Sequence, residues 1–278
     1  MKRVSLVPNF VTAFGLACGL FVIFKINMVE PGAGNYEMVR TSAILLLVAG
    51  LADLLDGALA RAIRAESEFG FVFDTLADTV SFGVAPSVLM LKALYLEQGS
   101  LFSFFGVTAA MVYSLCGVLR LVRFNVKAVE AKGNVEMQMA QRKHFTGLPI
   151  PAAAAAAISL NLLLISPLFQ RFWAMEQSER AIVLSCFMVV LGYLMVCRLK
   201  FPSLKMLRFK IPSFHLAFFL VLAAVFFLYG TLYFAAEMFF LVSWGYLLLS
   251  LCLSLIRFIM GKKSKTLADF DPDPEDED

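Results

Sequence analysis

Residues that bind soft metals or form disulfides are scarce in this chain of 278 residues. There are two histidines and five cysteines, and no two cysteines form a C-x-x-C pair. Neither a zinc site nor a disulfide framework is therefore expected, and the cysteines are interpreted as apolar packing residues.

Charged residues are also few. They make up 16% of the chain, whereas hydrophobic residues make up 60%, above the roughly 45 to 50% of soluble domains. The mean hydropathy is +0.80. These values exclude an ordinary soluble domain and predict an integral membrane protein.

The apolar segments predict an all-α fold, a polytopic membrane helix bundle with about eight transmembrane helices. Most of the segments reach the roughly 20 apolar residues that a crossing needs. The first is too long for a signal peptide and is expected to be retained. Small residues at 152–157 favour close packing in the bundle core or in a dimer contact. The expected spans are 8–28, 39–62, 70–96, 101–122, 148–169, 180–198, 212–231 and 235–258.

Basic residues predict the orientation of these spans. With a cytoplasmic N-terminus, nineteen of the 24 Lys and Arg residues lie on the inner side of the membrane, as the positive-inside rule requires. Both termini are then cytoplasmic, and the inner (cytoplasmic) membrane is the expected location. The last ten positions hold seven acidic residues, which predicts a disordered acidic tail over 261–278.

Carboxylates are almost absent from the apolar segments, with one exception. Asp53 and Asp56 are three residues apart, and Asp74 and Asp78 are four apart, so each pair shares one face of a helix. Carboxylates packed together repel one another unless they are protonated or bridged by cations. All-oxygen ligation suits Mg²⁺, Ca²⁺ or Mn²⁺, and the pattern predicts a metal site that opens toward the cytoplasm.

The full spacing is D-x2-D-G-x2-A-R-x8-G-x3-D-x3-D, which fixes eight positions over 26 residues from Asp53 to Asp78. It resembles the signature of the CDP-alcohol phosphotransferases at every position. Four further stretches resemble the phosphatidylserine synthase branch of that family. They are S-F-G-V-A-P from Ser81, R-L-x-R-F-N from Arg120, F-x-G-L-P-I-P-A from Phe145 and F-P-S from Phe201.

The resemblance implies transfer of the phosphatidyl group from CDP-diacylglycerol to the hydroxyl of L-serine, which gives phosphatidylserine and CMP. It implies a divalent cation cofactor, Mg²⁺ or Mn²⁺. Two such ions are expected, held by Asp53, Asp56, Asp74 and Asp78. Asp78 is the implied catalytic base. The implied CDP-binding residues are Asn9, Thr12, Asp53, Asp56, Gly57, Ala60, Arg61 and Gly70. Family members are usually homodimers, and membrane lipids rather than nucleic acid are the expected partners.

Two assignments stay open in the sequence. Asn9 and Thr12 follow a proline at the start of the first span, where they either contact the nucleotide or cap and back-bond the helix. The second assignment concerns Arg120, Arg123 and Asn125. They either bind serine or a lipid phosphate, or they are the basic and polar residues that usually end a helix on the cytoplasmic side of a membrane. Gly83 and Pro86 are expected to bend the third helix or to loosen its backbone hydrogen bonds.

The catalytic membrane domain is predicted over 1–205, followed by additional transmembrane helices over 206–260. The alternatives are the same family with another acceptor, glycerol 3-phosphate or inositol phosphate, and a protein of another class. Membrane aspartates also relay ions, so a divalent-cation transporter is one rival. An inactive scaffold with this fold is the other.

Overall fold

The computed structural model describes residues 6–29, 36–63, 67–94, 96–97, 99–130, 144–197, 200–202, 230 and 233–260. These residues are almost entirely helical. The elements are α1 (Leu6–Asn27), α2 (Tyr36–Ala62), α3 (Glu68–Asp78), the π-helix η2 (Thr79–Val84), α4 (Ala85–Ala93), α5 (Leu101–Glu130), β1 (His144–Thr146), α7 (Ile150–Leu164), α8 (Pro167–Phe172), α9 (Gln177–Val196), β2 (Lys200–Pro202) and α11 (Ala235–Met260).

Six helical segments of the described chain are long and apolar enough to cross a membrane, which supports an integral membrane protein. They match six of the eight expected spans. The expected span 148–169 is shorter, because α7 ends at Leu164 and the chain turns before Pro167. A residue before proline avoids helical backbone angles, and Ser166 is extended there. The span expected at 212–231 lies almost wholly outside the described residues.

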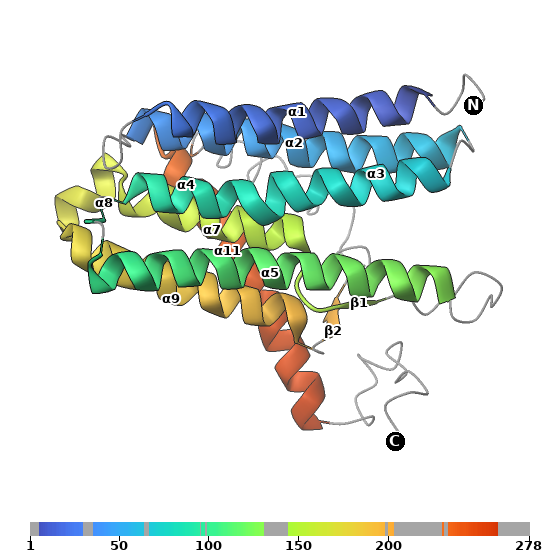
Figure 1. Ribbon diagram of the computed structural model, residues 1–278. Coiled ribbons are helices and arrows are strands. Elements are labelled where there is room, and N and C mark those ends of the chain that lie inside the picture. Colours follow the sequence, from blue (N-terminus) through green and yellow to red (C-terminus); the bar gives the residue numbers. More distant parts are fainter. Residues whose placement is uncertain are drawn as a thin grey trace, which may run out of the picture.

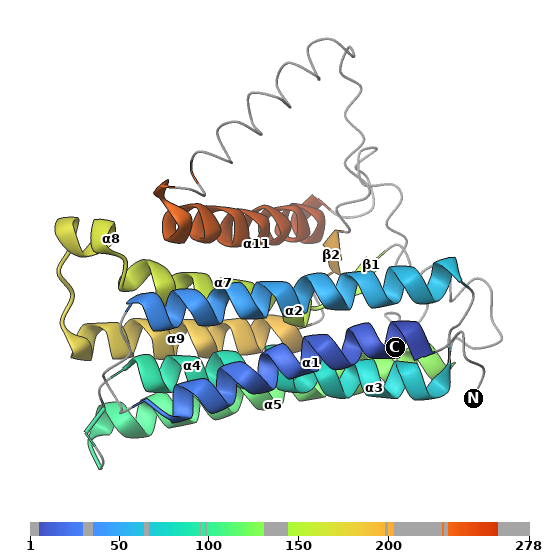
Figure 2. The same cartoon turned by 90° about the horizontal axis from the view of Figure 1, so that it is seen from above.

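Helices α1, α2, α3, α5 and α9 lie nearly side by side, whereas α11 crosses them obliquely on the side of α7 away from α3 and α5 (Figures 1 and 2). Helix α7 is buried along most of its length. Its alanines Ala153, Ala154, Ala156 and Ala157 are all within the core. The small-residue run therefore serves the bundle core, since short side chains let helices approach closely.

The third span is interrupted where Gly83 and Pro86 predict it. Residues Thr79–Val84 form a π-helix, and Pro86 lies at the start of α4. The carbonyl oxygen of Phe82 accepts a hydrogen bond from Tyr113 Oη at 3.1 Å. That of Gly83 accepts one from Ser114 Oγ at 2.9 Å. Side chains of α5 thus bond to the backbone of this irregular turn.

Strands β1 and β2 pair antiparallel, with Phe145 opposite Phe201. The pair joins the segment before α7 to the segment after α9, in the half of the bundle toward the junction of α2 and α3 (Figure 1). Gly147 follows β1 with a φ of +80°, a conformation that favours glycine. A β-carbon there would also overlap the carbonyl oxygen of Met195.

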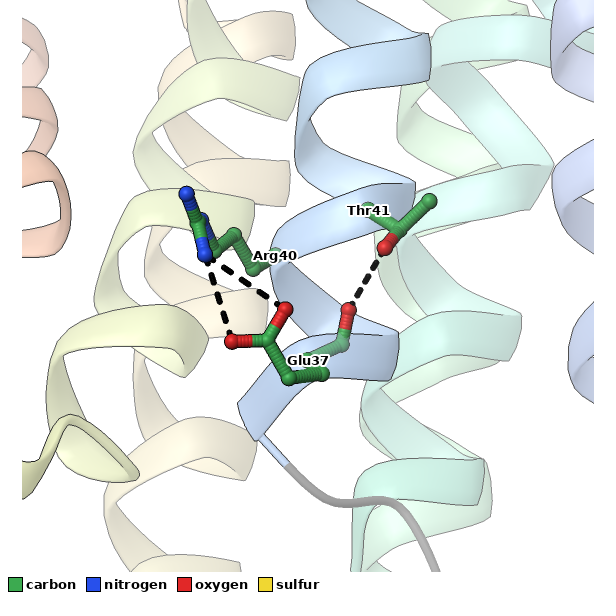
Figure 3. A network of polar contacts seen from close by, with 3 residues as sticks. All are labelled: Glu37, Arg40 and Thr41. Atoms are coloured by element: carbon green, nitrogen blue, oxygen red, sulfur yellow. Dashed lines mark hydrogen bonds and ion pairs between the residues drawn. The ribbon is translucent and has the colours of Figure 1, made fainter.

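The other end of α2 carries a small polar network (Figure 3). Arg40 pairs with Glu37 at 3.2 Å, and both side chains are exposed. The hydroxyl of Thr41 donates to the carbonyl oxygen of Glu37 at 2.7 Å. Exposed ion pairs of this kind contribute little to stability, so these residues provide control positions far from the aspartates.

Candidate active site

Two helices bring the predicted carboxylates together. Asp53 and Asp56 lie near the end of α2, and Asp74 lies on α3. Carboxylate oxygens of these three residues all lie within 4.8 Å of one another. Asp78 ends α3 and lines the same cavity. The i, i+3 and i, i+4 spacings place each pair on one helix face, and the two faces meet at this cavity.

The cavity between these carboxylates is closed on one side by α1. Besides the four aspartates, its lining consists of Thr12, Gly15, Leu16, Ala49, Ala77, Ser81 and Phe82. Within the described part of the chain, no histidine or cysteine lines it. A donor set made of carboxylate and hydroxyl oxygens fits a hard divalent cation such as Mg²⁺ or Mn²⁺ and not zinc.

Thr12 connects α1 to the carboxylates. Its hydroxyl donates to a carboxylate oxygen of Asp56, and it also lies 3.2 Å from the carbonyl oxygen of Pro8. Thr12 is 6% exposed and Asp56 is 4% exposed. The distance to Pro8 fits the back-bonding interpretation, but a hydroxyl has one hydrogen to donate, and donated to Asp56 it orients a predicted metal ligand. Its contact with a nucleotide stays a prediction.

Asn9 and Gly70 lie next to each other, on α1 and α3. A β-carbon on Gly70 would lie 2.9 Å from Asn9 Oδ1 and 3.1 Å from Ser67 Oγ. Real β-carbons essentially never lie that close to another heavy atom, so glycine at position 70 lets the start of α3 approach α1. Ser67 also accepts a hydrogen bond from the amide of Gly70 at 3.0 Å, which caps α3.

The other predicted nucleotide residues follow one another on the last turns of α2. Gly57 and Ala60 are half-buried, and Arg61 is exposed. A β-carbon on Gly57 would lie 3.7 Å from Arg61 Nη1, so the guanidinium lies over the glycine. This surface is adjacent to Asp56, and its contact with a nucleotide stays a prediction.

The three polar residues near the end of α5 have different surroundings. Arg120 is 8% exposed and lies within electrostatic range of Asp78 and Asp53. Arg123 donates to the carbonyl oxygen of Val196 at 2.9 Å, at the end of α9. Asn125 donates to Thr75 Oγ1 at 3.0 Å. The charge of Arg120 therefore acts on the aspartates from outside the cavity lining, whereas the other two residues tie α5 to its neighbours; substrate contacts of all three stay predictions.

Two glycines of α1 were not assigned from the sequence. Gly15 lines the cavity, and a β-carbon on Gly19 would lie 2.9 Å from Ser81 Cα. They are four residues apart, which is the G-x-x-x-G pattern of closely packed membrane helices. That pattern was the available signal for the approach of α1 to η2.

Comparison with known proteins agrees with this site. The family model for CDP-alcohol phosphatidyltransferase matches residues 5–192, which include the four aspartates. The chain belongs to the CDP-alcohol phosphatidyltransferase family. The region that matches the family model ends inside α9, so α11 lies beyond that region.

Three relatives carry the name CDP-diacylglycerol–serine O-phosphatidyltransferase. That of Helicobacter pylori (strain ATCC 700392 / 26695) is 33% identical over 210 residues, which are 75% of this chain and 77% of the relative. That of Bacillus subtilis (strain 168) is 30% identical over 72% of this chain and 91% of the relative. That of Methanocaldococcus jannaschii is 28% identical over 73% and 77%.

Proposed function

We propose that this CDP-alcohol phosphatidyltransferase transfers the phosphatidyl group of CDP-diacylglycerol to the hydroxyl of L-serine, giving phosphatidylserine and CMP. The observation that carries the proposal is the convergence of the aspartates of α2 and α3 on one cavity. It supports phosphoryl chemistry, and the names of the three relatives support serine as the acceptor.

The aspartates have two roles in this proposal. Asp53, Asp56, Asp74 and Asp78 would hold the divalent cation, or two of them. When bound, the cations supply charge neutralisation for the pyrophosphate and for the departing CMP. Asp78 accepts the proton of the serine hydroxyl as that oxygen attacks the phosphorus. Thr12 holds Asp56 in place by its hydrogen bond.

The remaining residues bind and orient the substrates. Arg61, exposed at the end of α2, extends over Gly57 and contacts the pyrophosphate, while Gly57 and Ala60 leave room for the cytidine. Asn9 lies beside Gly70 at the nucleotide side of the cavity. Arg120, which lies within electrostatic range of Asp78, receives an anionic group of the acceptor.

The proposal extends to topology and assembly. The protein has eight spans, both termini are in the cytoplasm, and the active site faces the cytoplasm at the inner membrane. The strong excess of basic residues on one side supports this orientation. Residues 1–205 form the catalytic domain, 206–260 add further membrane helices, and 261–278 form a disordered tail. The functional unit is a homodimer.

The test is CMP release from CDP-diacylglycerol by the purified full-length protein. Release is expected only with both serine and Mn²⁺ or Mg²⁺, and Asp78→Asn should lower it by about a hundredfold or more. Glu37→Gln makes the same type of change at the exposed end of α2 and should leave release unchanged.

Other outcomes of this assay separate the alternatives. Release driven by glycerol 3-phosphate or inositol phosphate but not by serine would keep the family and refute the acceptor. A protein that moves Mn²⁺ into vesicles without any CMP release would refute the transferase and favour a transporter. Full activity of Asp78→Asn would refute the assigned base.

A further inference from the structure

The π-helix η2 connects the aspartates of α3 to α4. Asp78 immediately precedes η2, and Ser81 and Phe82, which belong to it, line the cavity together with Asp78. On the side of α1, a β-carbon on Gly19 would lie 2.9 Å from Ser81 Cα, so the two helices are in close contact there. Single π-helical turns within α-helices are frequent at functional sites, and the backbone path of this one sets the position of Asp78.

One carbonyl of this turn lacks its usual helical donor. In an α-helix the carbonyl oxygen of Phe82 accepts a hydrogen bond from the amide of residue 86. Residue 86 is a proline, which has no N–H. Tyr113 Oη, on α5, donates to this oxygen at 3.1 Å, and Tyr113 is 0% exposed. The phenol of Tyr113 thus takes the place of the missing amide, at a depth where water does not reach it.

A second carbonyl of the turn is bonded in the same way. Ser114 Oγ donates to the carbonyl oxygen of Gly83 at 2.9 Å, and its oxygen can then accept from Ser87 Oγ on α4 at 3.0 Å. The backbones themselves approach closely, since a β-carbon on Gly117 would lie 3.7 Å from Gly83 Cα. Helix α5 therefore holds η2 at two successive carbonyls.

We propose that Tyr113 and Ser114 are positioning residues of the active site, which hold η2 against α5 and thereby keep Asp78 at the cavity. The inference rests on the proposed function and adds to it two side chains that lie outside the cavity lining. A buried carbonyl that loses its donor costs free energy, and a turn released from α5 moves the residue that precedes it. Because Asp78 is both a metal ligand and the base in the proposed reaction, its displacement affects metal binding and proton transfer together.

The experiment compares Tyr113→Phe with the wild-type protein, since this variant keeps the ring and loses only the hydroxyl. Mn²⁺ affinity, measured without turnover by electron paramagnetic resonance, should fall about tenfold. The kcat for CMP release should fall about tenfold or more, and saturating Mn²⁺ should not restore it, because the base is displaced as well as the metal ligand. Ser114→Ala should lower both quantities less, because Ser114 is half-buried and water can partly replace its hydroxyl.

A matched control separates positioning from a general loss of stability. Ser243 Oγ lies 2.6 Å from Ser159 Oγ, so Ser243→Ala also removes a buried hydroxyl that bonds between two helices, in this case α11 and α7. Neither of these serines lines the cavity. Both Ser243→Ala and Tyr113→Phe should have a lower Tm than the wild-type protein, but only Tyr113→Phe should lose Mn²⁺ affinity and kcat.

A second test concerns the missing amide. Pro86→Ala supplies an N–H at position 86, which can bond to the carbonyl oxygen of Phe82. Tyr113→Phe should therefore lower the Tm less in the Pro86→Ala background than in the wild-type background, because the carbonyl then has another donor. Equal losses of Tm in the two backgrounds would contradict the substitution of the phenol for the amide.

The outcomes distinguish this inference from the proposed function. If Tyr113→Phe keeps the Mn²⁺ affinity and kcat of the wild-type protein, the positioning role is refuted and the synthase activity stands. Equal losses of both quantities in Ser243→Ala refute it as well. If the wild-type protein shows no serine-dependent CMP release while Tyr113→Phe still loses Mn²⁺ affinity, the proposed function is refuted and the positioning of the metal ligand stands.

Discussion

Replacing Thr12 by Val removes the hydrogen bond from α1 to Asp56 while nearly conserving side-chain volume. A hydrogen bond to a charged group contributes about 1.5 to 3 kcal/mol, and partners that orient metal ligands change metal affinity about 10- to 100-fold. Because Thr12 and Asp56 are 6% and 4% exposed, water does not readily replace the lost donor. We expect Mn²⁺ affinity to fall by about 10- to 100-fold.

The assay is a titration of the purified protein with Mn²⁺, in which electron paramagnetic resonance reports the free ion. It requires no turnover. In parallel, the Mn²⁺ dependence of CMP release should move to higher concentration by the same factor, with the maximal rate largely recovered at saturating metal. Agreement between the two shifts would assign the effect to metal binding.

Two controls define the result. Thr12→Ser keeps the hydroxyl and should bind Mn²⁺ nearly as the wild-type protein does. Thr41→Val removes a hydroxyl that bonds within α2 (Figure 3) and should have no effect. Unchanged Mn²⁺ affinity in Thr12→Val would refute the idea that α1 supports the metal ligands.

Three further outcomes are expected. Gly19→Ala introduces a β-carbon 2.9 Å from Ser81 Cα and should lower the free energy of unfolding by about 1 to 3 kcal/mol, measured as a lower Tm. In the control Gly245→Ala the new β-carbon has nothing within 4 Å, so the Tm should not fall. Equal Tm values for the two variants would contradict the packing argument. Arg123→Gln removes the donor to Val196 at the end of α9 and should lower the Tm without changing the KM for serine; a changed KM at unchanged Tm would instead support substrate binding. Chelation by EDTA should abolish CMP release and added Mn²⁺ should restore it, whereas activity that survives chelation would exclude an essential cation.

The sequence predicted the elements that depend on local spacing. Asp53 and Asp56 share one face of α2, and Asp74 and Asp78 share one face of α3, because residues three or four apart lie on the same side of a helix. That the two faces meet depends on the packing of both helices against α1. The interruption near Gly83 also follows from the local sequence. Six of the predicted spans are present as apolar helices, because length and hydropathy are sufficient to define them.

Contacts between distant segments were not predictable in this way. Thr12 and Asp56 are 44 positions apart, and their meeting depends on how α1 packs against α2. Arg123 was a candidate substrate ligand from its motif, but it bonds to backbone 73 positions away. The predicted helix over 148–169 was too long for a local reason. Pro167 favours an extended backbone at Ser166, and a hydropathy average contains no information on backbone angles.

The π-helix Thr79–Val84 also determines the rotational phase between α3 and α4. One residue turns an α-helix by about 100° and advances it by about 1.5 Å. Deleting one residue from η2 would allow α3 and α4 to join as an uninterrupted α-helix. Deleting one residue from the α-helical part while the π-helix is kept would instead turn Asp74 and Asp78 by about 100° relative to the buried face of α4. The direction of the acidic groups is therefore governed by the number of residues between Asp78 and Pro86, a property that a deletion alters and a scan of single substitutions does not detect.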